Sequence, residues 1–180
     1  MRDDGGAVPV ARFKVQRAIT KVVDLKAGLV HAVVSTEDKD RQGDIIRQAG
    51  WNLDEFLKHP ILMSSHDYGS LRSQIGEWDE MAVKHKRLEG TAHYYLGEGN
   101  PEADWAFNLA TKGMAAYSVG FRPDMSKAVE LDGAEDSFFG GPWEYKAQEL
   151  LEVSHVTVPA NPNALQLMAK EGPLASLKLP

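Results

Sequence analysis

Apolar and small side chains alternate most regularly between residues 117 and 121. Tyr117, Val119 and Phe121 are large and apolar, whereas Ser118 and Gly120 between them are small. A period of two predicts a β-strand with one buried face. Ser118 then lies on the other face, where Gly120 leaves room for a second backbone to approach its hydroxyl. The stretch suits a nucleophile that attacks a peptide, and it equally suits a small serine with no chemical role.

Similar patterns predict further strands, and turn residues separate them. The expected strands cover residues 29–35, 61–66, 75–83, 88–96 and 143–158. The clearest helix follows Asn100, a good N-cap, with Pro101 at its first position and Gly113 after its end. We expect shorter helices at 51–57 and from Asn161 to about Glu171, and a long surface loop at 123–141.

Composition narrows the class of protein. The chain has 180 residues, 43% of them hydrophobic and 26% charged, and these values are typical of one globular domain. The formal net charge of −6 argues against nucleic acid or anionic membrane as a partner. The absence of cysteine excludes disulfides, thiolate nucleophiles and zinc sites built on cysteine. We find no signal peptide or apolar run of membrane-spanning length, and therefore expect a cytoplasmic protein.

A catalytic serine needs a base and a group that orients the base. Of the six histidines, His66 stands at the end of an apolar strand beside a turn. The carboxylate candidates are Asp67, Glu149 and Glu152. On a strand, Glu152 shares a face with Ser154 and lies opposite to His155. A charge among so many apolar neighbours needs a partner, although a pairing with a surface lysine or arginine fits equally well.

Several separated motifs occur in one order, and together they resemble the prohead proteases of tailed bacteriophages. The motifs, from Ser35 to Ala164, are Ser35-Thr36, Asp40, Gly43-Asp44, Gly50-Trp51, Pro60-Ile61-Leu62, His66-Asp67, Ile75-Gly76, Ser118-Val119-Gly120-Phe121, Glu152-Val153-Ser154 and Pro159-Ala160-Asn161-Pro162. The resemblance implies a serine endopeptidase with Ser118 as nucleophile, His66 as general base and Glu152 as third member. His155 contends for the third role, because the similar herpesvirus assembly proteases use a second histidine there.

The resemblance also implies a fold and a setting. We expect an α+β protein, a small, mostly antiparallel β-barrel surrounded by helices as in the herpesvirus proteases. The protease domain would cover residues 10–172, with an unordered segment at 1–9 and a tail at 173–180. Its substrates would be capsid and scaffolding protein, and the protease itself, inside the prohead assembling in the host cytoplasm. A homodimer is possible, and no cofactor or metal is expected.

Two other functions remain open at this stage. A catalytically silent, scaffold-like relative would bind capsid subunits, and in it Ser118, His66 and Glu152 would lie too far apart to touch. A metal-dependent hydrolase is disfavoured, because no pair of histidines has the helical spacing of ligands.

Overall fold

The computed structural model describes residues 22–24, 26–132 and 142–165. The segments predicted at 1–9 and 173–180, and the part of the predicted final helix after residue 165, lie outside this range. The described residues form one α-helix, α1 (Pro101–Thr111), and eleven strands. The strands are β1 (Val22–Asp24), β2 (Leu29–Thr36), β3 (Ile45–Ile46), β4 (Trp51–Asn52), β5 (Ile61–Ser64), β6 (Gln74–Lys84), β7 (Arg87–Tyr94), β8 (Ala116–Pro123), β9 (Val129–Glu130), β10 (Trp143–Tyr145) and β11 (Gln148–Val156).

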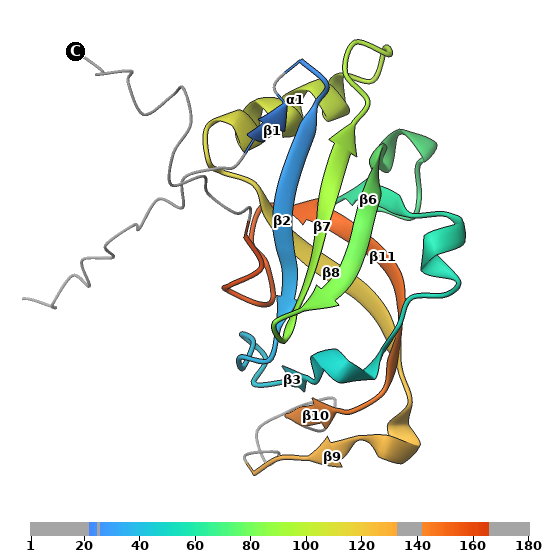
Figure 1. Cartoon of the computed structure of the whole chain (residues 1–180), viewed down its shortest axis with the longest axis vertical. Helices are drawn as coiled ribbons and strands as arrows, with labels where there is room; N and C mark the ends of the chain where they lie inside the picture. The colour runs from blue at the N-terminus through green and yellow to red at the C-terminus, as the bar shows by residue number, and fades with distance from the viewer. Residues whose placement is uncertain (1–21, 25, 133–141, 166–180) are drawn as a thin grey trace, which may run out of the picture.

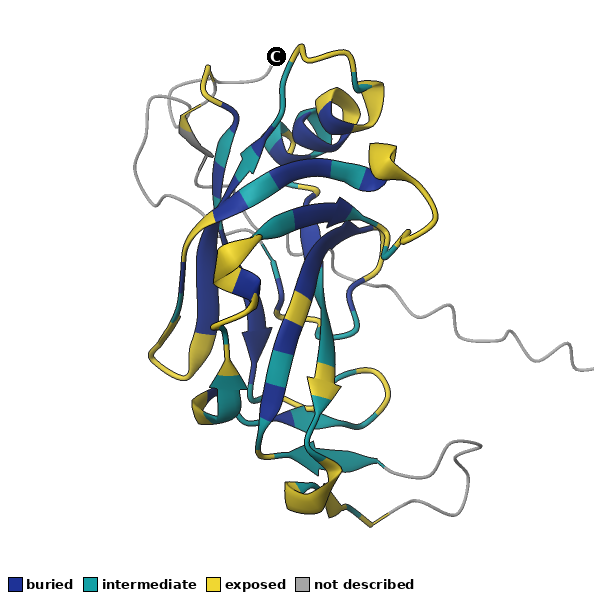
Figure 2. Cartoon of the chain, turned by 90° about the vertical axis from the view of Figure 1, so that its right-hand side faces the viewer, coloured by how far each residue is buried: buried dark blue, intermediate teal, exposed yellow. Residues whose placement is uncertain are grey.

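One strongly curled sheet forms the body of the molecule. Its order is β1-β2-β7-β6-β5-β11-β4, and β8 pairs antiparallel with β11 beside it. In Figure 1, β2, β7 and β6 lie in front of β8 and β11, so the sheet forms a half-barrel. Buried positions recur along its long strands, as Figure 2 shows, and the core includes Trp78, Tyr94 and Tyr117.

The β6–β7 hairpin shows how the local sequence sets the register. Lys84 pairs with Arg87, and the two residues between them, His85 and Lys86, both have positive φ values, 51° and 59°. This is the backbone of a type I′ turn, whose twist matches that of the flanking strands. The predicted hairpin at 75–83 and 88–96 is therefore confirmed, although the turn lacks the usual Asn or Gly.

Only one α-helix covers the sheet in the described residues. Asn100 caps α1 through its side chain, which accepts a hydrogen bond from the N–H of Glu102, and Pro101 begins the helix as predicted. Ala103, Phe107 and Ala110 are buried against the core. The helix lies across one end of the half-barrel (Figure 1), and β8 begins five residues after it.

The predicted α+β barrel surrounded by helices is wrong, because the structure is mostly β with a half-barrel sheet. Residues 51–57, expected as a helix, form β4 and a 3-10 turn, Phe56–Lys58. Their apolar spacing suits a short helix equally well, but Trp51 and Asn52 pair with Gln148 and Glu149 of β11. The sheet curls over its own core, so strands cover the apolar face that helices were expected to cover.

β2, which the short strand β1 flanks, and β8, which pairs with β11, do not pair directly with each other in the described residues. Instead, the chain after β11 enters between them. The N–H of Val33 in β2 donates to Leu165 O at 3.1 Å, and the N–H of Tyr117 in β8 donates to Ala164 O at 2.9 Å. This short segment therefore joins the two strands at Val33 and Tyr117.

Candidate active site

A histidine and a buried carboxylate meet beside the end of β5. His66 Nδ1 lies 2.5 Å from Glu152 Oε1, although 86 residues separate them in the sequence. The Glu152 side chain is 2% exposed and that of His66 is 36% exposed. A carboxylate this deeply buried requires a partner, and the imidazole provides it. The predicted pairing of His66 with Glu152 is therefore present.

The hydrogen bond defines which ring nitrogen is available for chemistry. The pKa of His66 is raised above its ordinary value, chiefly by the hydrogen bond to Glu152, while partial burial opposes the rise. With Nδ1 directed at the carboxylate, Nε2 is the nitrogen left to take a proton. This is the arrangement of a general base held in one tautomer.

Ser154 connects the two members of this pair. Its hydroxyl donates to Glu152 Oε2 at 2.7 Å and accepts from the backbone N–H of His66 at 3.0 Å. Ser154 is fully buried. Sequence reasoning placed it on the same face as Glu152 but assigned it no role, and that shared face was the available signal.

Ser118 lies next to this network on the neighbouring strand. In the β8–β11 ladder, Ser118 pairs with Ser154 and Gly120 pairs with Glu152. Ser118 and His66 both line one cavity of about 760 Å³. Among the described residues, however, no hydrogen bond joins the Ser118 hydroxyl to His66 or Glu152. Hydrogen bonds between nucleophile and base are often long before substrate binds.

Gly120 has a different role from the one predicted. The sequence suggested that its missing side chain admits another backbone to the serine. A Cβ at this position would instead lie 2.3 Å from Glu152 Oε1 and 2.9 Å from the Tyr68 hydroxyl. The space over Gly120 thus accommodates the carboxylate, and Tyr68, 3.4 Å from Glu152 Oε1, is a neighbour that the sequence did not indicate.

His155 is not placed as the third member. It lies on the opposite face of β11, where its Nδ1 is 3.1 Å from the Tyr94 hydroxyl and its ring packs against Tyr117. Burial lowers its pKa to about 4. The one irregularity in the ladder falls between Leu150 and Glu152, so the alternation from Glu152 to His155 is uninterrupted.

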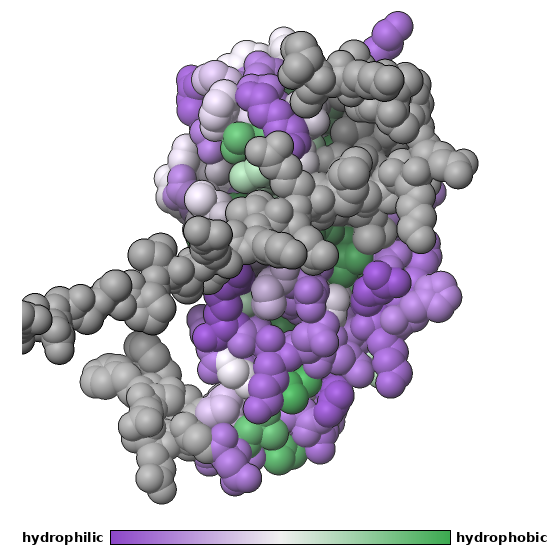
Figure 3. All heavy atoms as spheres, turned by 90° about the vertical axis from the view of Figure 1, so that its left-hand side faces the viewer, coloured by the Kyte–Doolittle hydropathy of each residue, from purple (hydrophilic) through white to green (hydrophobic). Residues whose placement is uncertain are grey.

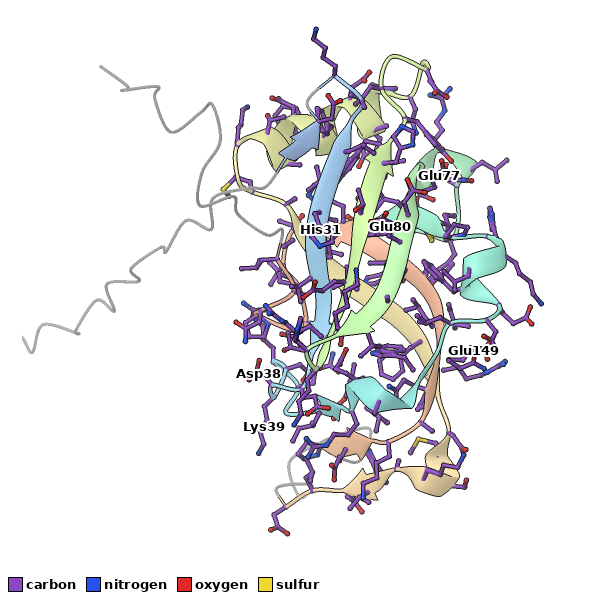
Figure 4. All side chains as sticks on the ribbon, in the orientation of Figure 1. His31, Asp38, Lys39, Glu77, Glu80 and Glu149 are labelled. Carbon is purple, nitrogen blue, oxygen red and sulfur yellow. The ribbon has the colours of Figure 1, made fainter. Side chains whose placement is uncertain are left out.

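The other two carboxylate candidates also point elsewhere. Glu149 bonds with Arg122 and lies on the outer side of the molecule, at the right of Figure 4. Asp67 accepts a hydrogen bond from the N–H of Gly69 in its own turn. Neither side chain has a bond to His66 in the part of the chain that the structure describes.

Part of the cavity lining comes from the turn after β2. Asp38, Asp40 and Asp44 line the cavity, together with Arg41. Asp40 Oδ1 accepts from the N–H groups of Gln42 and Asp44, and burial raises the pKa of the Asp40 carboxyl. These bonds hold the charged turn in place. The turn can be found in Figure 4 by the label on Asp38. Figure 3 shows the described residues that are visible on this side as mostly hydrophilic, with one hydrophobic area low on the face.

Comparisons of the chain with protein-family models, curated proteins and solved structures found no match. Across the described residues, no group of three or more histidine and acidic side chains is arranged to hold a metal ion. Within the same ranges, α1 is too short to cross a membrane, and no longer apolar helix is found.

Proposed function

We propose that the protein is a serine endopeptidase that cleaves capsid or scaffolding protein, and itself, during phage prohead maturation. The observation that carries the proposal is the buried Glu152 bonded to His66 at 2.5 Å, in a cavity that Ser118 also lines. The phage setting is supported by the ordered motifs from Ser35 to Ala164.

In the proposed reaction, Ser118 Oγ attacks the carbonyl carbon of the scissile peptide while His66 Nε2 takes the hydroxyl proton. The C–N bond then breaks as the same nitrogen returns that proton to the leaving amine. Water hydrolyses the resulting acyl-enzyme ester and regenerates Ser118. Glu152 stabilises the imidazolium that forms in both steps.

Residues of β2 and β8 both line the cavity, and an extended peptide can bind between these two strands. Because the N–H of Tyr117 points away from β11, towards Ala164, ladder alternation directs the N–H and C=O of Val119 the same way. These groups lie next to Ser118 and face the cavity, whose lining includes Val34 and Thr36 of β2. A substrate strand added at this edge would bring its backbone to the nucleophile.

The silent, scaffold-like alternative predicts that the three residues lie too far apart to touch. His66 and Glu152 are in contact, which is contrary to that prediction, whereas Ser118 has no bond to either. Ser118 and His66 nevertheless line the same cavity. We therefore favour the enzyme.

Two measurements test the proposal. Intact mass is followed over time for wild type, Ser118→Ala and the control Ser126→Ala, each alone and with candidate capsid or scaffolding protein. Ser126 is a suitable control because, among the described residues, its hydroxyl bonds only to Asp124 in its own exposed turn. We expect fragments from wild type and Ser126→Ala and none from Ser118→Ala. Continued cleavage by purified Ser118→Ala would refute the assignment.

The second measurement requires no knowledge of the substrate. A fluorophosphonate reacts with an activated serine when Oγ bonds to phosphorus and fluoride leaves. We expect the probe to label Ser118 in wild type, at a rate that rises with pH as His66 loses its proton. A folded wild type whose Ser118 is not labelled would favour the silent alternative.

A further inference from the structure

The geometry points to Ser154 as a positioning residue that locks both the general base and its carboxylate in the proposed active site. The inference rests on the proposed function, because a positioning residue needs a reaction to serve. Ser154 has two roles at once: it orients the side chain of Glu152 and it holds the backbone of His66.

The first task concerns the Glu152 carboxylate. Its Oε1 faces His66 Nδ1 at 2.5 Å, and its Oε2 receives the Ser154 hydroxyl at 2.7 Å. The Tyr68 hydroxyl also donates to Oε1, at 3.4 Å, whereas Ser154 is the donor to Oε2, so rotation of the carboxylate about its last bond would break contacts at both oxygens. At 2% exposure, water cannot easily replace either donor. The Ser154 hydroxyl therefore fixes the plane in which Glu152 meets the imidazole.

The second task concerns the backbone of His66. His66 and Ser65 have positive φ values, 56° and 54°, a conformation that side-chain-bearing residues rarely adopt. Two consecutive residues of β11 hold this turn. Ser65 N–H donates to His155 O at 3.0 Å, and His66 N–H donates to Ser154 Oγ at 3.0 Å. Strained backbone conformations of this kind persist where several surrounding hydrogen bonds hold the backbone in place.

Accessibility distinguishes Ser154 from Ser118 as a nucleophile. The two serines face each other across the β8–β11 ladder. Ser154 is 0% exposed and its proton is already donated to Glu152, whereas Ser118 lines the cavity. Ser154 thus lies behind the reacting groups and acts through Glu152 and His66.

The test compares wild type with Ser154→Ala and Ser154→Cys, and uses Thr91→Ala as a matched control. Thr91 also carries a largely buried hydroxyl bonded to a histidine, His31, at 3.1 Å, but it does not line the cavity. The readouts are the rate of fluorophosphonate labelling of Ser118 against pH, and the titration of the His66 ring by NMR. Urea unfolding confirms that each variant is folded under the assay conditions.

We expect Ser154→Ala to be labelled about 10- to 100-fold more slowly, the range expected when a hydrogen bond to a charged group is lost. The pH midpoint of labelling and the pKa of His66 should both fall towards the value of an ordinary histidine. Ser154→Cys keeps a similar shape with a weaker donor, so its rate should lie in between. Thr91→Ala should match wild type.

A folded Ser154→Ala or Ser154→Cys with the wild-type labelling rate and an unchanged His66 titration would overturn the inference. If Ser154→Ala does not fold, Ser154→Cys decides the question by the same criteria. If wild type is not labelled at Ser118, the proposed function fails, and the His66 titration still tests the positioning role. An unchanged titration then overturns that role, and a shifted titration supports it.

Discussion

Substitution of Gly120 by alanine tests the packing of the site most directly. The added Cβ would lie 2.3 Å from Glu152 Oε1, whereas ordinary contact begins at 3.4 Å. The carboxylate oxygen therefore has to retreat by about 1 Å. The hydrogen bond to His66, 2.5 Å long, then exceeds the normal range. The backbone of Gly120 does not have a positive φ, so no conformational strain adds to this effect.

We expect Gly120→Ala to reduce the labelling rate of Ser118 by about 100-fold, because a displacement of 1 Å in a catalytic group has effects of this size. The free energy of unfolding should fall by only about 0.5–3 kcal/mol. The weakened hydrogen bonds of the carboxylate cost about 1.5–3 kcal/mol, and the lower entropy of the unfolded alanine chain offsets up to about 1 kcal/mol.

The assay measures labelling rate and urea unfolding on the same preparations. Gly97→Ala is the control, because a Cβ there meets nothing within 4 Å while the φ of 70° makes alanine strained. It should lose about 1 kcal/mol of stability and no activity. Wild-type labelling by Gly120→Ala would refute the reasoning, as would an equal loss of activity in Gly97→Ala.

Two further predictions concern stability. The buried His155 has a pKa of about 4, so the unfolded chain takes up its proton first as the pH falls from 6.5. The protein should lose on the order of 3 kcal/mol of stability between pH 6.5 and pH 4 from this residue. His155→Asn should reduce that loss in urea unfolding, and an identical pH dependence would contradict the prediction. Gly76→Ala places a Cβ 2.1 Å from His93 O in the β6–β7 ladder, and should lower the free energy of unfolding by about 3 kcal/mol. A thermal midpoint equal to that of wild type would exclude this clash.

Local patterns in the sequence predicted the elements that depend on nearby residues. The cap of α1 at Asn100, the β6–β7 hairpin and the strand that carries Ser118 all follow from residues a few positions apart. The alternation along β11 also placed Glu152 and His155 on opposite faces. Period-two patterns suffice for such statements because neighbouring side chains on a strand point to opposite sides.

Pairings between distant strands required the tertiary structure. Trp51 and Asn52 are a strand because β11 pairs with them, and residues 164 and 165 enter between β2 and β8, which no local pattern indicated. The sequence motifs indicated Ser118, His66 and Glu152 as candidate site residues. Only the fold brings His66 to a carboxylate 86 residues away. The fold also places that carboxylate in the space over Gly120, and it places Ser154 where it bonds to both Glu152 and His66. Contacts of this kind depend on the register and curvature of the whole sheet, which no short stretch of sequence specifies.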